Sequence, residues 1–140
     1  MNPLAKMTVD GFDAIDAQLA KLGRPAIRRI VEAGAKADED EWRANIRQAG
    51  HIRTGAMLES VGSAAYKEFL GGGEMSVYPQ GEDGKGVSNA IKAYVINYGR
   101  GKRTGKLGDK FITGKLPTIE ERVHEAMQAE SDRILMEINN

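Results

Sequence analysis

The chain has 140 residues, a length that suits one domain and is short for two. Twenty lysines and arginines balance twenty aspartates and glutamates, so global charge gives no support to a freestanding nucleic-acid binder. No cysteine occurs, which excludes disulfides, thiol nucleophiles and cysteine-bound zinc. The opening residues lack an apolar run long enough for a signal peptide, and no stretch approaches membrane-spanning length. We therefore expect a soluble intracellular protein with a single domain over residues 1–140.

Two amphipathic helices are predicted in the first third of the chain. The first covers residues 12–22, with Asp10 as its N-cap and Gly23 as the residue that ends it. The second runs from Pro25 to Ala49 and ends at Gly50, since proline is well tolerated in a first helical turn. Their apolar residues recur at spacings of three and four: Phe12, Ile15, Leu19 and Leu22, then Ile27, Ile30, Val31, Gly34, Ala37, Trp42 and Ile46. The acidic band 38–41 interrupts the second stripe, and we expect it to face solvent or a partner.

The middle of the chain is rich in glycine and predicts short elements. Thr54 is placed to cap a short turn through Leu58. Residues 60–70 and 74–78 flank three glycines at 71–73, which predicts a β-hairpin with a glycine tip.

A polar loop and a short helix are predicted next. Residues 79–87 are polar and contain three glycines, and we expect them to be mobile. Ser88 is placed to cap a helix that ends at Gly99. The large side chains of this helix share one face: Ile91, Tyr94, Val95 and Tyr98.

Residues 99–115 form a basic, glycine-containing segment that we expect to be mobile in the isolated chain. Its only acid is Asp109, and Phe111-Ile112 is its only apolar anchor. Six positions are basic: Arg100, Lys102, Arg103, Lys106, Lys110 and Lys115.

A last helix is predicted from Pro117, with Thr118 and Glu121 at the spacing of a capping box. Its apolar stripe contains Ile119, Val123, Met127, Ile134 and Ile138. Its charge is opposite to that of the preceding segment, with six acids: Glu120, Glu121, Glu125, Glu130, Asp132 and Glu137. The chain as a whole is neutral, but a basic segment is followed by an acidic helix. We expect the stripes of the two longest helices, including Ile27, Ile30, Val31, Val123, Met127 and Ile134, to form the core.

No pattern in the chain points to catalysis. The two histidines, His51 and His124, lie far apart, and neither has an identifiable catalytic partner in the sequence. Metalloprotease, nucleophile-elbow, phosphate-loop and dinucleotide-binding motifs are all absent. We expect no enzymatic activity, no catalytic residue, no cofactor and no metal site, and we expect Trp42 to be a core or interface residue.

Three stretches of the chain, taken in order, resemble one family. Thr54-Gly55, then Met57, then Ser60-Val61 resemble the TG-x-L-x-x-S-I signature of tail-completion and head–tail joining proteins of long-tailed bacteriophages. That family typically opens with a Gly-aromatic-Asp stretch, matched here by residues 11–13, and has a tyrosine-rich stretch, matched by residues 93–99. The resemblance covers residues 10–100. Asn97 stands where the family usually has glutamate, and the family's later proline–phenylalanine element has no counterpart.

The resemblance implies a structural virion protein. We expect an α+β domain in which long helices pack on a small antiparallel sheet, and a ring at the head–tail interface as a tail-completion, tail-terminator or head–tail joining protein. The implied partners are further copies of the chain in a ring, hexameric as in the family, the phage connector or stopper, the tail-tube protein and packaged DNA. The implied location is the virion neck or tail, after assembly in the host cytoplasm, with no membrane partner.

A ring built head to tail uses two different surfaces of one subunit, and opposite charges favour that contact. The candidate interface residues are Arg100, Lys102, Arg103, Lys106, Lys110, Glu121 and Glu125. The alternative function is a small nucleic-acid-binding accessory protein that uses the basic 99–115 segment.

Overall fold

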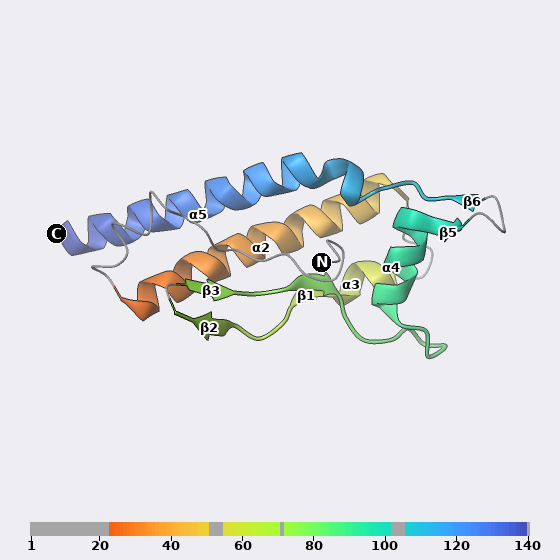
Figure 1. The fold of residues 1–140 in the computed structure, drawn as a ribbon, viewed down its shortest axis with the longest axis horizontal. Coiled ribbons are helices and arrows are strands. Elements are labelled where there is room, and N and C mark those ends of the chain that lie inside the picture. Colours follow the sequence, from red (N-terminus) through yellow and green to blue (C-terminus); the bar gives the residue numbers. More distant parts are fainter. Residues whose placement is uncertain (1–22, 51–54, 71, 102–105, 140) are drawn as a thin grey trace.

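The largest elements of the fold are two long antiparallel helices. The computed structural model describes residues 23–50, 55–70, 72–101 and 106–139. Helix α2 (Arg24–Gln48) lies between helix α5 (Leu116–Asn139) on one side and two short antiparallel strand pairs on the other (Figure 1). The predicted α+β class, with long helices on a small antiparallel sheet, is confirmed. The predicted helix 12–22 lies outside the described residues.

The span of helix α2 matches the prediction, because the sequence carries a boundary signal at each end: a proline in the first turn and a glycine after the last. Pro25 occupies the first turn, and the chain leaves the helix through Gly50, whose φ is +76°. A β-carbon on Gly34 would lie 2.9 Å from the side chain of Met127, so glycine lets α2 and α5 approach closely at this level.

The core follows the predicted stripes with few exceptions. Ile30, Val31, Val123, Met127 and Ile134 are all buried, whereas Ile27 is only partly buried. Ile138 is 56 % exposed, because it lies in the last turn of α5, beyond the end of the buried stripe. Helix α5 begins at Leu116 after a 3-10 turn, Thr113–Lys115, so the predicted capping box is wrong: Thr118 is already inside the helix.

The expectation that the whole acidic band 38–41 faces solvent or a partner is wrong at Asp38. This residue is 1 % exposed, and neither carboxylate oxygen has a hydrogen-bond partner in the described part of the chain. Position 38 continues the buried row of α2, four residues after Gly34 and four before Trp42. Burial, reinforced by the charges of Glu39 and Glu41, raises the pKa of Asp38 to about 7.

Short strands after α2 form a broken antiparallel hairpin. Helix α3 (Ala56–Ser60) begins at Gly55, whose φ is +74°, whereas Thr54, the predicted cap, lies outside the described residues. Strand β1 (Val61–Ser63) pairs with β4 (Val77–Pro79), and β2 (Lys67–Phe69) pairs with β3 (Gly72–Glu74). The two pairs are offset because residues 64–66 stand opposite only residues 75–76, an extra residue on the first arm.

The predicted three-glycine tip is wrong in one respect: Gly72 and Gly73 are paired residues of β3. Aromatic rings of the opposite arm occupy the space that side chains would need there. A β-carbon on Gly72 would lie 2.8 Å from the ring of Phe69, and one on Gly73 would overlap the phenol of Tyr66. The guanidinium of Arg28, in α2, lies 5.3 Å from the centre of the Tyr66 ring and ties this arm to the long helix.

The polar segment after β4 is organised around Asp83. Its carboxylate accepts hydrogen bonds from the backbone N–H of Lys85 and of Val87, at 2.8 and 2.9 Å, and from the Lys92 ammonium at 2.8 Å. These bonds lower the pKa of Asp83 to about 2, with the Lys92 bond as the largest cause. The expected mobility of residues 79–87 in solution stays a prediction.

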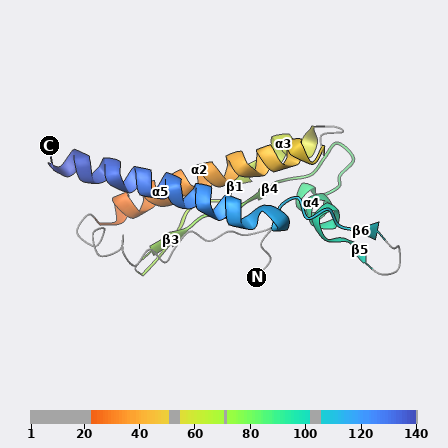
Figure 2. The same ribbon diagram turned by 90° about the horizontal axis from the view of Figure 1, so that it is seen from above.

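The helix predicted after Ser88 is confirmed as α4 (Asn89–Tyr98). The Ser88 hydroxyl accepts a hydrogen bond from the backbone N–H of Ile91 at 3.3 Å, and Gly99 follows the helix with a φ of +86°. The chain continues into β5 (Gly99–Gly101), which pairs with β6 (Lys106–Leu107). In both views this hairpin lies at the end of the molecule opposite to the C-terminus of α5 (Figures 1 and 2).

Candidate assembly surface

Helix α4 buries small and polar residues and exposes large apolar ones. Its buried residues are Asn89, Ala93 and Asn97, which recur every four positions and define the inner face. The outer face carries Ile91, Tyr94 and Tyr98, which are 61 %, 47 % and 42 % exposed. The rings of the two tyrosines lie 4.8 Å apart between centroids, and Val87, also exposed, lies just before the helix. We call Ile91, Tyr94 and Tyr98 the α4 outer face.

Asn97 fixes the position of the segment that follows the hairpin. Its side-chain carbonyl accepts hydrogen bonds from the backbone N–H of Ile112 and of Thr113, at 3.0 and 3.1 Å. Its amide nitrogen donates to the Thr113 hydroxyl at 3.0 Å. The side-chain amide provides both a donor and an acceptor here, whereas an ionised carboxylate would offer acceptors alone. Asn97 therefore has a structural role in this chain.

The base of the β5–β6 hairpin is anchored on both strands. Gly108 packs so closely on the backbone of Asn97 and Tyr98 that a β-carbon would overlap it. Beyond it, Phe111 and Ile112 are buried, as the sequence predicted for this anchor, and Phe111 meets Trp42 edge to face at 6.3 Å between ring centroids.

The predicted basic residues that the structure describes lie in the strands of the hairpin or just after it. Arg100 lies in β5 and Lys106 in β6, so the backbone of the hairpin carries both. Lys110 is exposed in the turn after the hairpin, with a φ of +53°. Lys102 and Arg103 lie outside the described residues. The hairpin thus places its described basic positions at one end of the molecule (Figure 1).

The predicted acidic partners lie in the first half of α5. Glu120, Glu121 and Glu125 are all exposed. Glu125 pairs with Arg122 at 3.6 Å, whereas Glu120 and Glu121 have no hydrogen bond or ion pair in the described part of the chain. Two carboxylates on this surface are therefore available to a positively charged neighbour.

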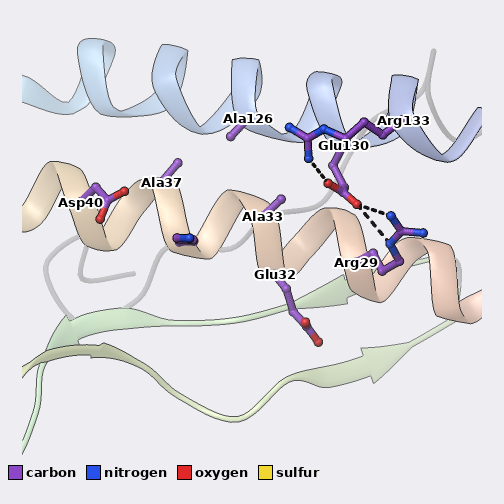
Figure 3. A pocket seen from close by; sticks show the side chains of 9 residues that line it. Arg29, Glu32, Ala33, Ala37, Asp40, Ala126, Glu130 and Arg133 are labelled. Atoms are coloured by element: carbon purple, nitrogen blue, oxygen red, sulfur yellow. Dashed lines mark hydrogen bonds and ion pairs between the residues drawn. The ribbon is translucent and has the colours of Figure 1, made fainter. Parts of the chain in front are cut away.

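An open groove between α2 and α5 has alanines along its floor and charges on its rims (Figure 3). Glu130 accepts hydrogen bonds from Arg29, at 2.7 Å from Nη2, and from Arg133, and Arg29 also reaches Glu137 at 2.8 Å. The Arg29 hydrogen bond lowers the pKa of Glu137. These ion pairs join the two helices, and the rim charges compensate one another. The lining residues are Arg29, Glu32, Ala33, Lys36, Ala37, Asp40, Ala126, Glu130 and Arg133.

The described residues offer no candidate metal centre. Among them, no group of three or more histidines, aspartates and glutamates is placed to hold a metal ion. His124 is exposed on α5, and His51 lies outside the described residues. In the same part of the chain, every helix is too short or too polar to cross a lipid bilayer.

Comparison of the chain with protein-family models, with curated proteins and with solved structures finds no match.

Sequence reasoning missed the outward direction of the α4 outer face and the burial of Asp38. The available signal for α4 was the repeat of Asn89, Ala93 and Asn97, which marks a second face with a four-residue spacing. For Asp38 the signal was its place between Gly34 and Trp42 on the apolar row of α2.

Proposed function

We propose that this chain is a structural virion protein of a tailed bacteriophage that forms a ring at the head–tail interface, as a tail-completion, tail-terminator or head–tail joining protein. The observation that carries the proposal is the presence of two oppositely charged regions on one subunit, the basic hairpin segment and the carboxylates of α5. A head-to-tail ring needs two such different surfaces, and opposite charges favour their contact over the pairing of identical surfaces.

The ordered motifs support the same proposal and also have folding roles. Gly55 starts α3 in a left-handed conformation, and the Ser60 hydroxyl donates to the carbonyl of Met57 at 2.7 Å where α3 gives way to β1. The tyrosine-rich stretch ends α4 and begins β5 at Gly99. Since these residues define junctions of the fold, they support a shared architecture more directly than a shared partner.

The proposed partners follow from the proposed place in the virion. They are further copies of the chain in a hexameric ring, the connector or stopper, the tail-tube protein and packaged DNA near the basic segment. A protein with this role assembles in the host cytoplasm and performs no catalysis.

Sedimentation velocity of the purified chain, alone and with tail-tube protein, tests the proposal. We expect a closed oligomer of defined mass, and we expect the association of its subunits to weaken as the salt concentration is raised. The rival is a monomeric accessory protein that binds DNA through residues 99–115 with a strong salt dependence. A chain that stays monomeric with or without tail-tube protein, yet binds DNA at physiological ionic strength, would establish the rival.

A further inference from the structure

The groove between α2 and α5 has a shape that accepts a third helix. Its floor is formed by partly buried alanines, Ala33 and Ala37 of α2 and Ala126 of α5 (Figure 3). A helix with large apolar side chains fits a floor of small ones, because ridges on one helix pack into grooves on another. Among the described elements, the strand pairs lie on another side of α2 and leave this groove open (Figure 1).

The chain enters α2 at the end where this groove begins. Gly23, directly before the helix, has a φ of +80°, and glycine adopts such angles without strain where a chain turns sharply. Arg29, the first residue of α2 that lines the groove, lies less than two turns beyond the start of the helix. A preceding helix that turns back at Gly23 therefore reaches the groove at once and runs antiparallel to α2, as in other helical hairpins with a short loop.

The segment that precedes Gly23 has the sequence and the length that this groove requires. Its large apolar side chains are spaced by three, four and three residues: Phe12, Ile15, Leu19 and Leu22. Residues 12–22 would extend about 16 Å as a helix, and residues 29–40 of α2, which include the groove lining, extend about 18 Å. In an antiparallel arrangement Leu19 comes level with the start of the groove and Phe12 with its far end.

The charges of the segment agree with those of the groove rim. Asp13 and Asp16 flank the apolar stripe, each one position after a stripe residue. Lys36 is exposed in the middle of the α2 rim, and no ion pair joins it to another described residue. An acidic flank laid along this rim brings opposite charges together.

We propose that residues 12–22 form a helix that packs in the groove between α2 and α5 of the same copy, with its apolar stripe on Ala33, Ala37 and Ala126. The contact is intramolecular, because the segment is joined directly to α2 and is present at a high effective concentration. The α4 outer face is a poor site for this helix, since α4 lies at the opposite end of the molecule from the start of α2 (Figures 1 and 2). The contact concerns one subunit and is independent of the proposed ring function.

Hydrogen exchange of the full chain, at a concentration where it is monomeric, tests the contact. Ala33→Arg places a long charged side chain on the groove floor. Ala129→Arg is the matched control, because Ala129 is exposed on α5 and does not line the groove. We expect protected amides over residues 12–22 in the original chain and in the control. Ala33→Arg should accelerate exchange there by at least about tenfold and leave the middle of α2 unchanged.

Chemical crosslinking gives a second measurement that does not depend on how Ala33→Arg folds. The chain has no cysteine, so an introduced pair is unique. In one variant, Ile15→Cys is combined with Ala33→Cys, and in its control Ile15→Cys is combined with Ile91→Cys in α4. A short bis-maleimide should join the first pair within one chain at least about tenfold faster than the control pair, because proximity sets the rate.

Three results would overturn the contact. The first is rapid exchange over residues 12–22 in the original chain, or equal exchange there in a folded Ala33→Arg variant. The second is equal crosslinking of the two cysteine pairs. The third is protection that appears only at concentrations where the chain associates, which would assign the segment to the groove of a second copy. The ring function is tested separately, by the sedimentation of the original chain.

Discussion

The long-helix pair and α4 use their apolar residues in opposite ways. In α2 and α5 the apolar stripes point inward, and residues such as Ile30 and Met127 are almost completely buried. In α4 the inner face holds Asn89, Ala93 and Asn97, and the large apolar side chains point outward. Periodicity therefore identifies which residues share a helix face, and the surrounding structure decides whether that face meets the core or the surface.

The two regions also differ in whether their buried polar side chains have hydrogen-bond partners. Asn97 in α4 has its side-chain carbonyl and amide hydrogen-bonded to the segment after the hairpin. Asp38 in α2 has no such partner in the described part of the chain. A buried polar group with partners fixes the path of the chain, whereas one without partners costs stability.

The largest expected difference in the free energy of unfolding is between the variants Ile30→Ala and Tyr94→Ala. The first deletes a core side chain and should lower the free energy of unfolding by about 2–5 kcal/mol. The second changes an exposed side chain and should alter it by no more than about 0.5 kcal/mol in the monomer. Urea unfolding at a concentration that keeps the chain monomeric measures both, and similar losses for the two variants would refute the assignment of α4 to the surface.

The Asp38→Asn variant should remove a pH dependence of stability. The pKa of Asp38 is about 7 in the folded chain and near 4 when unfolded, so between these values only the unfolded chain has ionised this group. Its contribution makes the fold less stable as pH rises from about 4 to 7, by up to about 4 kcal/mol, and constant above that.

The variant should therefore stabilise the chain most at pH 8 and least near pH 4, measured by urea unfolding at several pH values. Asp40→Asn is the matched control, since Asp40 is exposed two residues away on the same helix. Equal pH profiles for the original chain and Asp38→Asn would contradict the burial of an ionisable group at this position.

Removing the Asn97 side chain should have an intermediate effect. Asn97→Ala leaves the buried N–H of Ile112 without its acceptor, which should cost about 1–3 kcal/mol. Hydrogen exchange should accelerate at the amides of Ile112 and Thr113 more than at amides in the middle of α2. Uniform acceleration over both regions would show that Asn97 acts on global stability alone.

The smallest effect on folding is expected from reversing the charge of the basic segment. Arg100, Arg103 and Lys106, all changed to glutamate, should shift the melting temperature little, because the sequence predicts a solvated segment here and solvated charges contribute under about 1 kcal/mol each. The same series should weaken assembly, and adding Glu121→Lys and Glu125→Lys should restore it if the segment meets α5 of a neighbour. Normal assembly by the unrescued series would show that these charges serve no contact.

The sequence predicted the long elements well because their signals agree. In α2 the apolar repeat, Pro25 and Gly50 all point to the same span, and in α4 Ser88 and Gly99 do so. The class of fold and most of the core followed from those elements. The short strands were predicted as one hairpin, whereas the structure has two offset pairs in which the rings of Tyr66 and Phe69 cover the glycines of β3.

The candidate surface was only half predictable. The opposite charges of residues 99–115 and of the last helix are visible in the sequence. The direction of the α4 outer face is not visible in the sequence. A ten-residue helix with one apolar and one mixed face can bury either face, and the neighbouring elements decide which one meets the core. The burial of Asp38 was not predicted, because a run of four acids suggests a solvent-exposed face, although one member of this run lies on the buried row of α2.

The anchoring of the hairpin at Asn97 and Gly108 has a consequence for how this protein changes over generations. The bonds and close contacts that hold the base come from residue 97, residue 108 and the segment 111–113. The side chain of Lys110, between them, is exposed, so a substitution there can alter the charge that a partner meets without disturbing the core. A lineage that acquires a new neighbour can adapt its contact by substitution there while it inherits the fold unchanged.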